Sequence, residues 1–179
     1  DTNDMNFTGT STQPRYNFGL NLSVAYKGFD FYMLWAGSAG FDLYWNHSSY
    51  NGTRTENGFG ISQRVADNHY FYNPENPSDS RTNITAKYPR ITDQTQRDNG
   101  TSSVFWKYKG DYVKLKNIQI GYTIPVKWTR KFMVEKLRFY FSGENLLTIT
   151  SYPGLDPEMG TSITYPLTRQ FAFGAQLSF

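Results

Sequence analysis

The sequence predicts an all-β fold, the antiparallel strands of a transmembrane β-barrel, and three observations support this. Five segments alternate apolar and polar side chains with a period of two. Because successive side chains of a strand point to opposite sides, each segment has one apolar and one polar face. The connections between the segments are alternately short and long, and aromatic residues make up 18% of the chain. Both features are typical of outer-membrane barrels.

The first two strands are expected at about residues 16–27 and 29–36. In the first, alternate residues are apolar: Tyr16, Phe18, Leu20, Leu22, Val24 and Tyr26. Lys27-Gly28 supplies a tight turn, and a second apolar row follows at Phe29, Phe31, Met33 and Trp35. This pattern predicts a hairpin.

Residues 37–110 are rich in Gly, Asn, Asp, Pro and Ser, and we expect them to form one long extracellular loop. A connection of this length without secondary structure normally argues against the strand assignment. Outer-membrane barrels are the exception, since one rim of the barrel carries long loops.

Three more strands are expected at about 112–124, 137–149 and 167–179. The periplasmic turn at 125–136 includes one short amphipathic helical turn, and a second extracellular loop spans 150–166. In this topology five aromatic residues lie near the periplasmic rim as a girdle: Tyr26, Phe29, Tyr122, Trp128 and Phe179.

The two faces of the strands have different expected surroundings. The lipid-facing residues are Phe18, Leu20, Leu22, Phe31, Ile118, Ile120, Phe139, Phe171 and Phe173. The inward-facing polar residues are Asn17, Asn21, Asn117, Gln119, Arg138, Glu144, Gln176 and Ser178. Five strands cannot close a barrel, so we expect the chain to be the carboxy-terminal piece of a longer protein.

Composition excludes several other classes of protein. No run of about 18 apolar residues exists, which excludes a transmembrane helix. The absence of cysteine excludes disulfides and thiolate sites. The net charge of +3 is small, and the basic residues of the chain are dispersed. Nucleic acid is therefore not an expected partner.

Four stretches of the second half carry a family resemblance: YVKLKNIQIGYTIP at 112–125, LRFYFSGENLLTIT at 137–150, YPGLDPEMG at 152–160 and YPLTRQFAFGAQLSF at 165–179. In this order they closely resemble the end of SusC/RagA-type TonB-dependent transporters. Residues 16–40 are similar to the strand pair that precedes these in the same family. Only the long loop is weakly covered.

This resemblance implies the last five strands of a plugged barrel of about 22 strands in the bacterial outer membrane. It also implies a SusD-like surface lipoprotein as partner, import of oligosaccharides or peptides, and energy from TonB through parts not in this chain. The plug domain is not recognisable in the chain. Gly174, Leu177 and Phe179 resemble the signal read by the outer-membrane assembly machinery, although Ala172 stands where a polar residue is common.

We expect neither an enzyme nor a cofactor, because the residues give no strong catalytic or metal site. His47 and His69 lie near Asp42, Asp67 and Ser48 but lack the spacing of a zinc or triad motif, so solvated loop histidines are expected. Asp156 and Glu158 are interpreted as turn residues, because Asp precedes Pro and Gly ends the segment.

Two groups of loop residues are candidate contact sites. Tyr44, Trp45, Tyr50, Tyr70, Phe71, Tyr72 and Trp106 are aromatic residues in polar loops. They are suited to internal packing or to a partner, and less to direct contact with substrate. Lys107, Lys109, Lys114 and Lys116 are expected to form a solvated basic rim, with pairing to lipopolysaccharide phosphates as the alternative.

Two other readings remain. A soluble antiparallel β-sandwich that binds carbohydrate would also give alternating strands and turn-rich loops. An outer-membrane hydrolase would need a nucleophile, base and orienting group at one rim, and no such set is identifiable.

Overall fold

The computed structural model describes residues 9, 11–45, 60–91, 104–162 and 165–179. The chain forms two compact units, one of residues 1–42 and 109–179 and the other of residues 43–108. We call them the sheet unit and the loop unit and describe each by itself. No helix in the described part is long and apolar enough to cross a bilayer.

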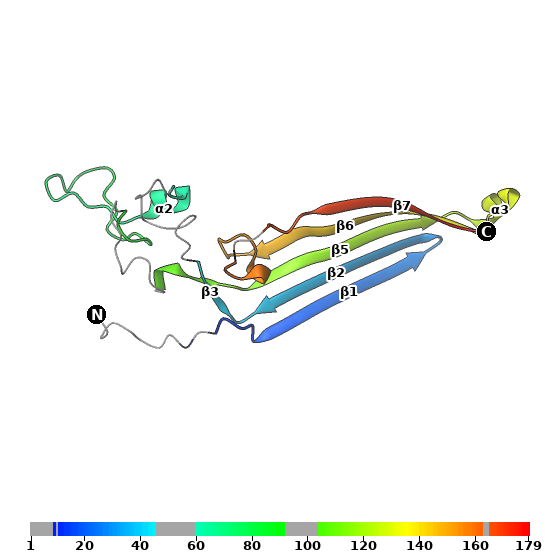
Figure 1. Cartoon of the computed structure of the whole chain (residues 1–179), viewed down its shortest axis with the longest axis horizontal. Coiled ribbons are helices and arrows are strands. Elements are labelled where there is room, and N and C mark those ends of the chain that lie inside the picture. Colours follow the sequence, from blue (N-terminus) through cyan, green and yellow to red (C-terminus); the bar gives the residue numbers. More distant parts are fainter. Residues whose placement is uncertain (1–8, 10, 46–59, 92–103, 163–164) are drawn as a thin grey trace. The chain divides into compact units, whose positions relative to one another are not determined.

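The sheet unit is one five-stranded antiparallel sheet in the order β1-β2-β5-β6-β7 (Figure 1). Its strands are β1 Tyr16–Tyr26, β2 Phe29–Ala39, β5 Tyr112–Thr123, β6 Lys136–Thr150 and β7 Gln170–Ser178. The order follows the sequence, so each strand pairs with its predecessor in the sheet. β2 continues to Ala39 instead of ending at residue 36, and β7 begins at Gln170 instead of residue 167.

The short connections have defined structures. Lys27 and Gly28 both have positive φ, 48° and 90°, as the tight turn between two twisted antiparallel strands requires. Between β5 and β6 lie α3 Val126–Thr129 and the 3-10 helix η5 Arg130–Phe132, where the sequence predicts a short helical turn. The β6–β7 connection contains a 3-10 helix, η6 Pro157–Met159.

The strand register places an alternating apolar row from each of the five strands on one face, while Tyr32 and Leu34 of β2 lie on the other. Across one row, Leu22 pairs with Met33 and Met33 with Ile118; across another, Ile120 pairs with Phe141 and Phe141 with Phe173. This apolar face is exposed, at 58% for Leu20, 49% for Ile120 and 75% for Phe173. A soluble sandwich would bury these side chains under a second sheet, so the sandwich alternative is not supported.

A β-bulge at Lys116 keeps the apolar face continuous. Val113 and Leu115 lie on that face before the bulge, and Ile118, Ile120 and Tyr122 lie on it after. The apolar positions therefore change from odd to even numbers within β5. The extra residue, Lys116, shifts the alternation by one position. The even-numbered apolar residues after the bulge therefore lie on the same face as the odd-numbered ones before it.

The loop unit has secondary structure and a small core of its own, which corrects the expectation of a loop without regular elements at 37–110. It contains the helix α2 Gln63–Asn68 and the 3-10 helix η4 Val104–Trp106. Strands β3 Asp42–Tyr44 and β4 Lys107–Lys109 form a two-stranded sheet. Val65, Tyr88 and Trp106 are buried together with Ile61 packed against them.

Candidate functional site

The face opposite the apolar one is polar and carries several side chains that interact across strands. One register row joins Asn21, Leu34, Asn117, Glu144 and Gln170; another joins Asp30, Gly121, Tyr140 and Gly174. The predicted inward-facing residues lie on this face by register. It is therefore suited to contact water or polar solutes.

An ion pair crosses the polar face between β2 and β6. Arg138 donates from Nε and Nη2 to the two carboxylate oxygens of Asp30, at 2.9 and 2.5 Å. Gly121 on β5 lies beneath the pair, and a Cβ there would be 2.5 Å from Arg138 Nη2 and 2.6 Å from Asp30 Oδ1. The glycine therefore leaves the space in which the two side chains meet. Such a two-point contact fixes the orientation of both groups.

A second ion network joins β5 to the loop that contains η6. Lys114 Nζ donates to Asp156 Oδ2 at 2.5 Å and to Glu158 Oε2 at 2.9 Å. Lys116 Nζ donates to both carboxylate oxygens of Glu158. We call these four residues the loop latch. Since Lys114 lies on the polar face by register, the latch holds the loop against that face.

The loop is also stabilised locally. Asp156 Oδ1 accepts a hydrogen bond from the Glu158 amide at 2.8 Å, which caps η6, and Tyr152 donates from its hydroxyl to the Gly160 carbonyl at 3.0 Å. Burial alone would raise the pKa of Glu158. Hydrogen bonds from Lys116 and Lys114 outweigh that effect, so the pKa of Glu158 lies below its ordinary value of 4.5.

The latch changes two expectations from the sequence. The interpretation of Asp156 as a turn residue is correct, because it caps η6. In addition, Lys114 and Lys116 of β5 contact Asp156 and Glu158. The expectation of a solvated basic rim is wrong for Lys114, which is 1% exposed. Lys109 is within 3.4 Å of Asp42, and its own side chain is largely exposed. Two lysines separated from two carboxylates by about forty residues give no local motif, so the sequence did not reveal the pairing.

The loop aromatic residues divide into buried and exposed groups. Trp106 is 1% and Trp45 is 5% exposed, so both side chains are packed inside this structure, and partner contact at these positions stays a prediction. The Trp106 ring stacks on Tyr88 at 5.6 Å, and the Tyr88 hydroxyl lies 2.8 Å from that of Tyr108. Tyr70 and Tyr72 are exposed, whereas Tyr44 and Phe71 are half-buried. Tyr50 lies outside the described residues.

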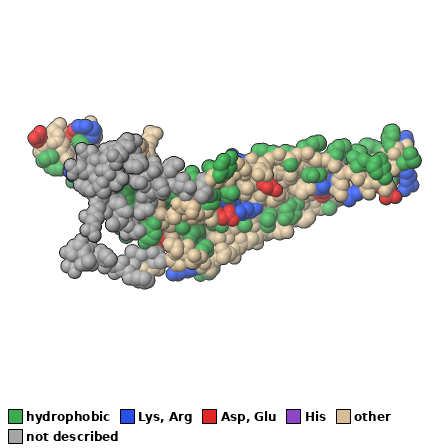
Figure 2. All heavy atoms as spheres, in the orientation of Figure 1, with side chains coloured by type: hydrophobic (Ala, Val, Ile, Leu, Met, Phe, Trp, Pro, Cys, Tyr) green, Lys and Arg blue, Asp and Glu red, His purple; other side chains and the backbone are tan. Residues whose placement is uncertain are grey.

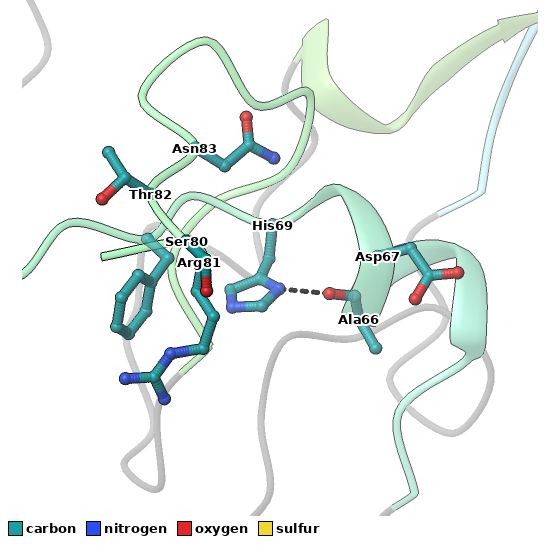
Figure 3. A pocket seen from close by; sticks show the side chains of 8 residues that line it. Ala66, Asp67, His69, Ser80, Arg81, Thr82 and Asn83 are labelled. Atoms are coloured by element: carbon teal, nitrogen blue, oxygen red, sulfur yellow. Dashed lines mark hydrogen bonds between the residues drawn. The ribbon is translucent and has the colours of Figure 1, made fainter. Parts of the chain in front are cut away.

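An open pocket of about 560 Å³ lies in the loop unit (Figure 3). His69 and Arg81 lie on its wall with Phe71 and Asn83, and the Arg81 guanidinium is 4.7 Å from the Phe71 ring centre. Arg81 is held by Asp79, and its hydrogen bonds lower the pKa of Asp79 to about 2. Among the polar side chains that line the pocket, those of His69, Arg81 and Thr82 already have hydrogen-bond partners within the loop unit.

The histidine positions give no metal or triad geometry in the described residues. His69 Nδ1 lies 2.5 Å from the Ala66 carbonyl oxygen (Figure 3). The described residues contain no group of three or more His, Cys, Asp or Glu side chains that could hold a metal ion. His47 and Ser48 lie outside the described residues.

The residues predicted as an assembly signal are all on β7 or directly after it. Leu177 is 49% and Phe179 is 78% exposed. Gly174 lies on the polar face, where a Cβ would be 2.4 Å from the Tyr140 ring. Gly174 thus has a packing reason of its own, and the assembly role stays a prediction.

No protein-family profile matches this chain. TonB-dependent receptor P3 of Formosa agariphila is 31% identical over 99% of this chain and 18% of the receptor. TonB-dependent receptors P26 and P39 of the same organism are 27% and 26% identical over 83% and 90% of this chain. The chain spans only 14% to 18% of the length of these receptors.

Solved structures give the same result. The RagAB peptide importer in its open-open state matches with a TM-score of 0.69 and 25% identity, over 95% of this chain and 18% of that one. These residues are a barrel segment of a TonB-dependent receptor of the SusC/RagA type. The closed-closed state of RagAB gives a TM-score of 0.70 at 22% identity, which supports the fold. The match assigns this barrel segment to the bacterial outer membrane.

Proposed function

We propose that this chain supplies five neighbouring strands to the wall of a TonB-dependent importer. The importer would take up oligosaccharides or peptides across the outer membrane. Similarity to TonB-dependent receptors and to the RagAB peptide importer supports this proposal. The observation that carries it is the register, which aligns one apolar row from each of the five strands on a single exposed face.

The apolar face would contact lipid, and the polar face would line the passage around a plug. A hydrocarbon environment removes the cost of exposing Phe18, Leu20 and Phe173. The outer edges of β1 and β7 would pair with further strands of the same barrel, because open edges in lipid leave backbone groups unsatisfied.

The two long connections, 40–111 and 151–169, leave the sheet at the same end because the strands are antiparallel. We place this end outside the cell, where barrels carry their long loops. Exposed Tyr70 and Tyr72 would then be available to a SusD-like surface lipoprotein. In this role the chain needs no catalytic residue, and we propose that it is not an enzyme.

A matched pair of substitutions in β1 tests the proposal. Leu20→Arg puts a charge on the proposed lipid face, and Asn21→Arg puts one at the same depth on the polar face. Arginine near the bilayer centre costs about 2–4 kcal/mol in a barrel. We therefore expect Leu20→Arg, but not Asn21→Arg, to lower the amount of heat-modifiable, folded full-length protein in outer membranes. Equal effects of the two substitutions would overturn the proposal.

A further inference from the structure

The connection between β5 and β6 presents a helical turn on a firm base at one end of the sheet. The Ile124 amide donates to the Leu137 carbonyl at 2.9 Å, and the Glu135 amide donates to the Ser178 carbonyl at 2.9 Å. The Val134 amide returns to the Thr129 carbonyl at 3.3 Å. Backbone hydrogen bonds thus fix the turn to the ends of β5, β6 and β7.

Four apolar side chains project from this turn into the surroundings. Val126 is 44% exposed, Trp128 67%, Phe132 76% and Met133 85%. Trp128 lies in α3 and Phe132 in η5, which follows it without a break. These four exposed apolar side chains lie within eight residues, and such a concentrated apolar patch marks a surface for a partner or a membrane.

Basic side chains lie beside the apolar ones. Lys127, Arg130 and Lys131 are all exposed. Figure 2 shows basic and hydrophobic side chains together at the end of the sheet where α3 lies in Figure 1. Thr129, in the same stretch, is buried at 5% exposure. The turn therefore exposes apolar and basic side chains beside each other and buries Thr129.

We propose that residues 126–133, the anchor turn, bind the anionic phospholipid surface at the short-turn rim of the barrel. Trp128, Phe132 and Met133 would enter the boundary between headgroups and acyl chains. Lys127, Arg130 and Lys131 would pair with lipid phosphates. This inference rests on the proposed function, because it requires the strands to cross the membrane.

Two observations favour lipid over a protein partner. The anchor turn is continuous with the apolar face, since Tyr122 and Phe139 pair with each other at the adjoining ends of β5 and β6. The Phe29 and Tyr122 rings also lie 4.4 Å apart at this end. Aromatic groups flanked by Lys and Arg match an interface of acyl chains below and phosphates above. A patch without these basic residues would carry no such complementarity.

The test uses the full-length transporter, freed of other thiols, with a nitroxide label on Met133→Cys. The protein is placed in vesicles of phosphatidylcholine, with or without phosphatidylglycerol. Label depth is measured from accessibility to oxygen, which concentrates in lipid, and to a water-soluble nickel complex. We expect the label to lie at the headgroup boundary, and deeper when phosphatidylglycerol is present.

Charge variants make the test specific. A basic residue near an anionic surface contributes roughly a fivefold gain in binding, so Lys127→Glu, Arg130→Glu and Lys131→Glu together should move the label into water. The matched control replaces Lys127 and Lys131 with Arg and Arg130 with Lys, and should leave the label in place.

A second label at Phe173→Cys separates the two proposals. If both labels are water-accessible, the membrane assignment of the strands fails. If the label at 173 is in lipid but the label at 133 is in water in every vesicle, the proposal that the anchor turn binds phospholipid fails. Protection of position 133 in native outer membranes but not in vesicles would indicate a protein partner and overturn the lipid assignment.

Discussion

Lys114 shows how a single residue can connect two distant parts of the chain. Its side chain is 2% exposed, and a charge in such a place is costly unless it is paired. Asp156 and Glu158 provide the pairing, and Asp156 also caps η6. The loop between β6 and β7 is thereby held to a strand that precedes it by about forty residues.

Removing Lys114 should loosen this loop much more than removing Lys116. In Lys114→Ala the Asp156 carboxylate, 10% exposed, loses its cation, and breaking a buried pair costs roughly 3–5 kcal/mol. Lys116 is 26% exposed, and a surface pair is worth about 1 kcal/mol or less. Hydrogen exchange of amides 156–160 in the full-length protein measures the difference. Equal acceleration in the two variants would contradict the latch.

The latch should also respond to acid. The pKa of Glu158 is lowered in the folded state, so its stabilising contribution is complete above its ordinary value of 4.5 and is lost as the pH falls through the lower, folded value. We expect a spin label on Thr161 to keep constant mobility from neutral pH to about 5 and to become mobile in stronger acid. In Glu158→Gln this transition should weaken or disappear. A mobility change near neutral pH in the parent protein would show that another group controls the loop.

At the scale of elements, period-two alternation was enough to predict the strands, because each strand has one apolar and one polar face. The change of apolar positions from odd to even numbers in β5 is visible in the sequence and marks the bulge at Lys116. The small core of the loop unit gives no such signal. Val65, Tyr88 and Trp106 meet from separate segments without a common period. The loop latch could not be predicted either, because its lysines and carboxylates lie about forty residues apart and form no local pattern.

The role of Gly174 can be separated from that of an assembly signal. Gly174→Ala brings a methyl group against the Tyr140 ring, which faces it across β6 and β7. If packing alone explains the glycine, Tyr140→Ala combined with Gly174→Ala should restore barrel assembly that Gly174→Ala impairs. The measurement is the amount of heat-modifiable protein in outer membranes. An unchanged defect in the double variant would support a direct role of Gly174 in assembly.

At the scale of the whole molecule, the sheet has two faces with different chemistry along its entire width. The apolar face is continuous from β1 to β7, and the polar face carries the Asp30–Arg138 pair and the loop latch. A soluble domain would cover the apolar face with protein. A barrel wall leaves it open to lipid and turns the polar face toward water, which fits the similarity to outer-membrane receptors.

A nitroxide scan along β5 in the reconstituted full-length protein tests this account most directly. Oxygen accessibility should peak at 113 and 115, shift phase at the bulge, and peak again at 118, 120 and 122. The nickel complex should favour the positions between these peaks. Oxygen peaks that keep to odd numbers throughout, or equal accessibility on both faces, would contradict a continuous lipid-facing surface.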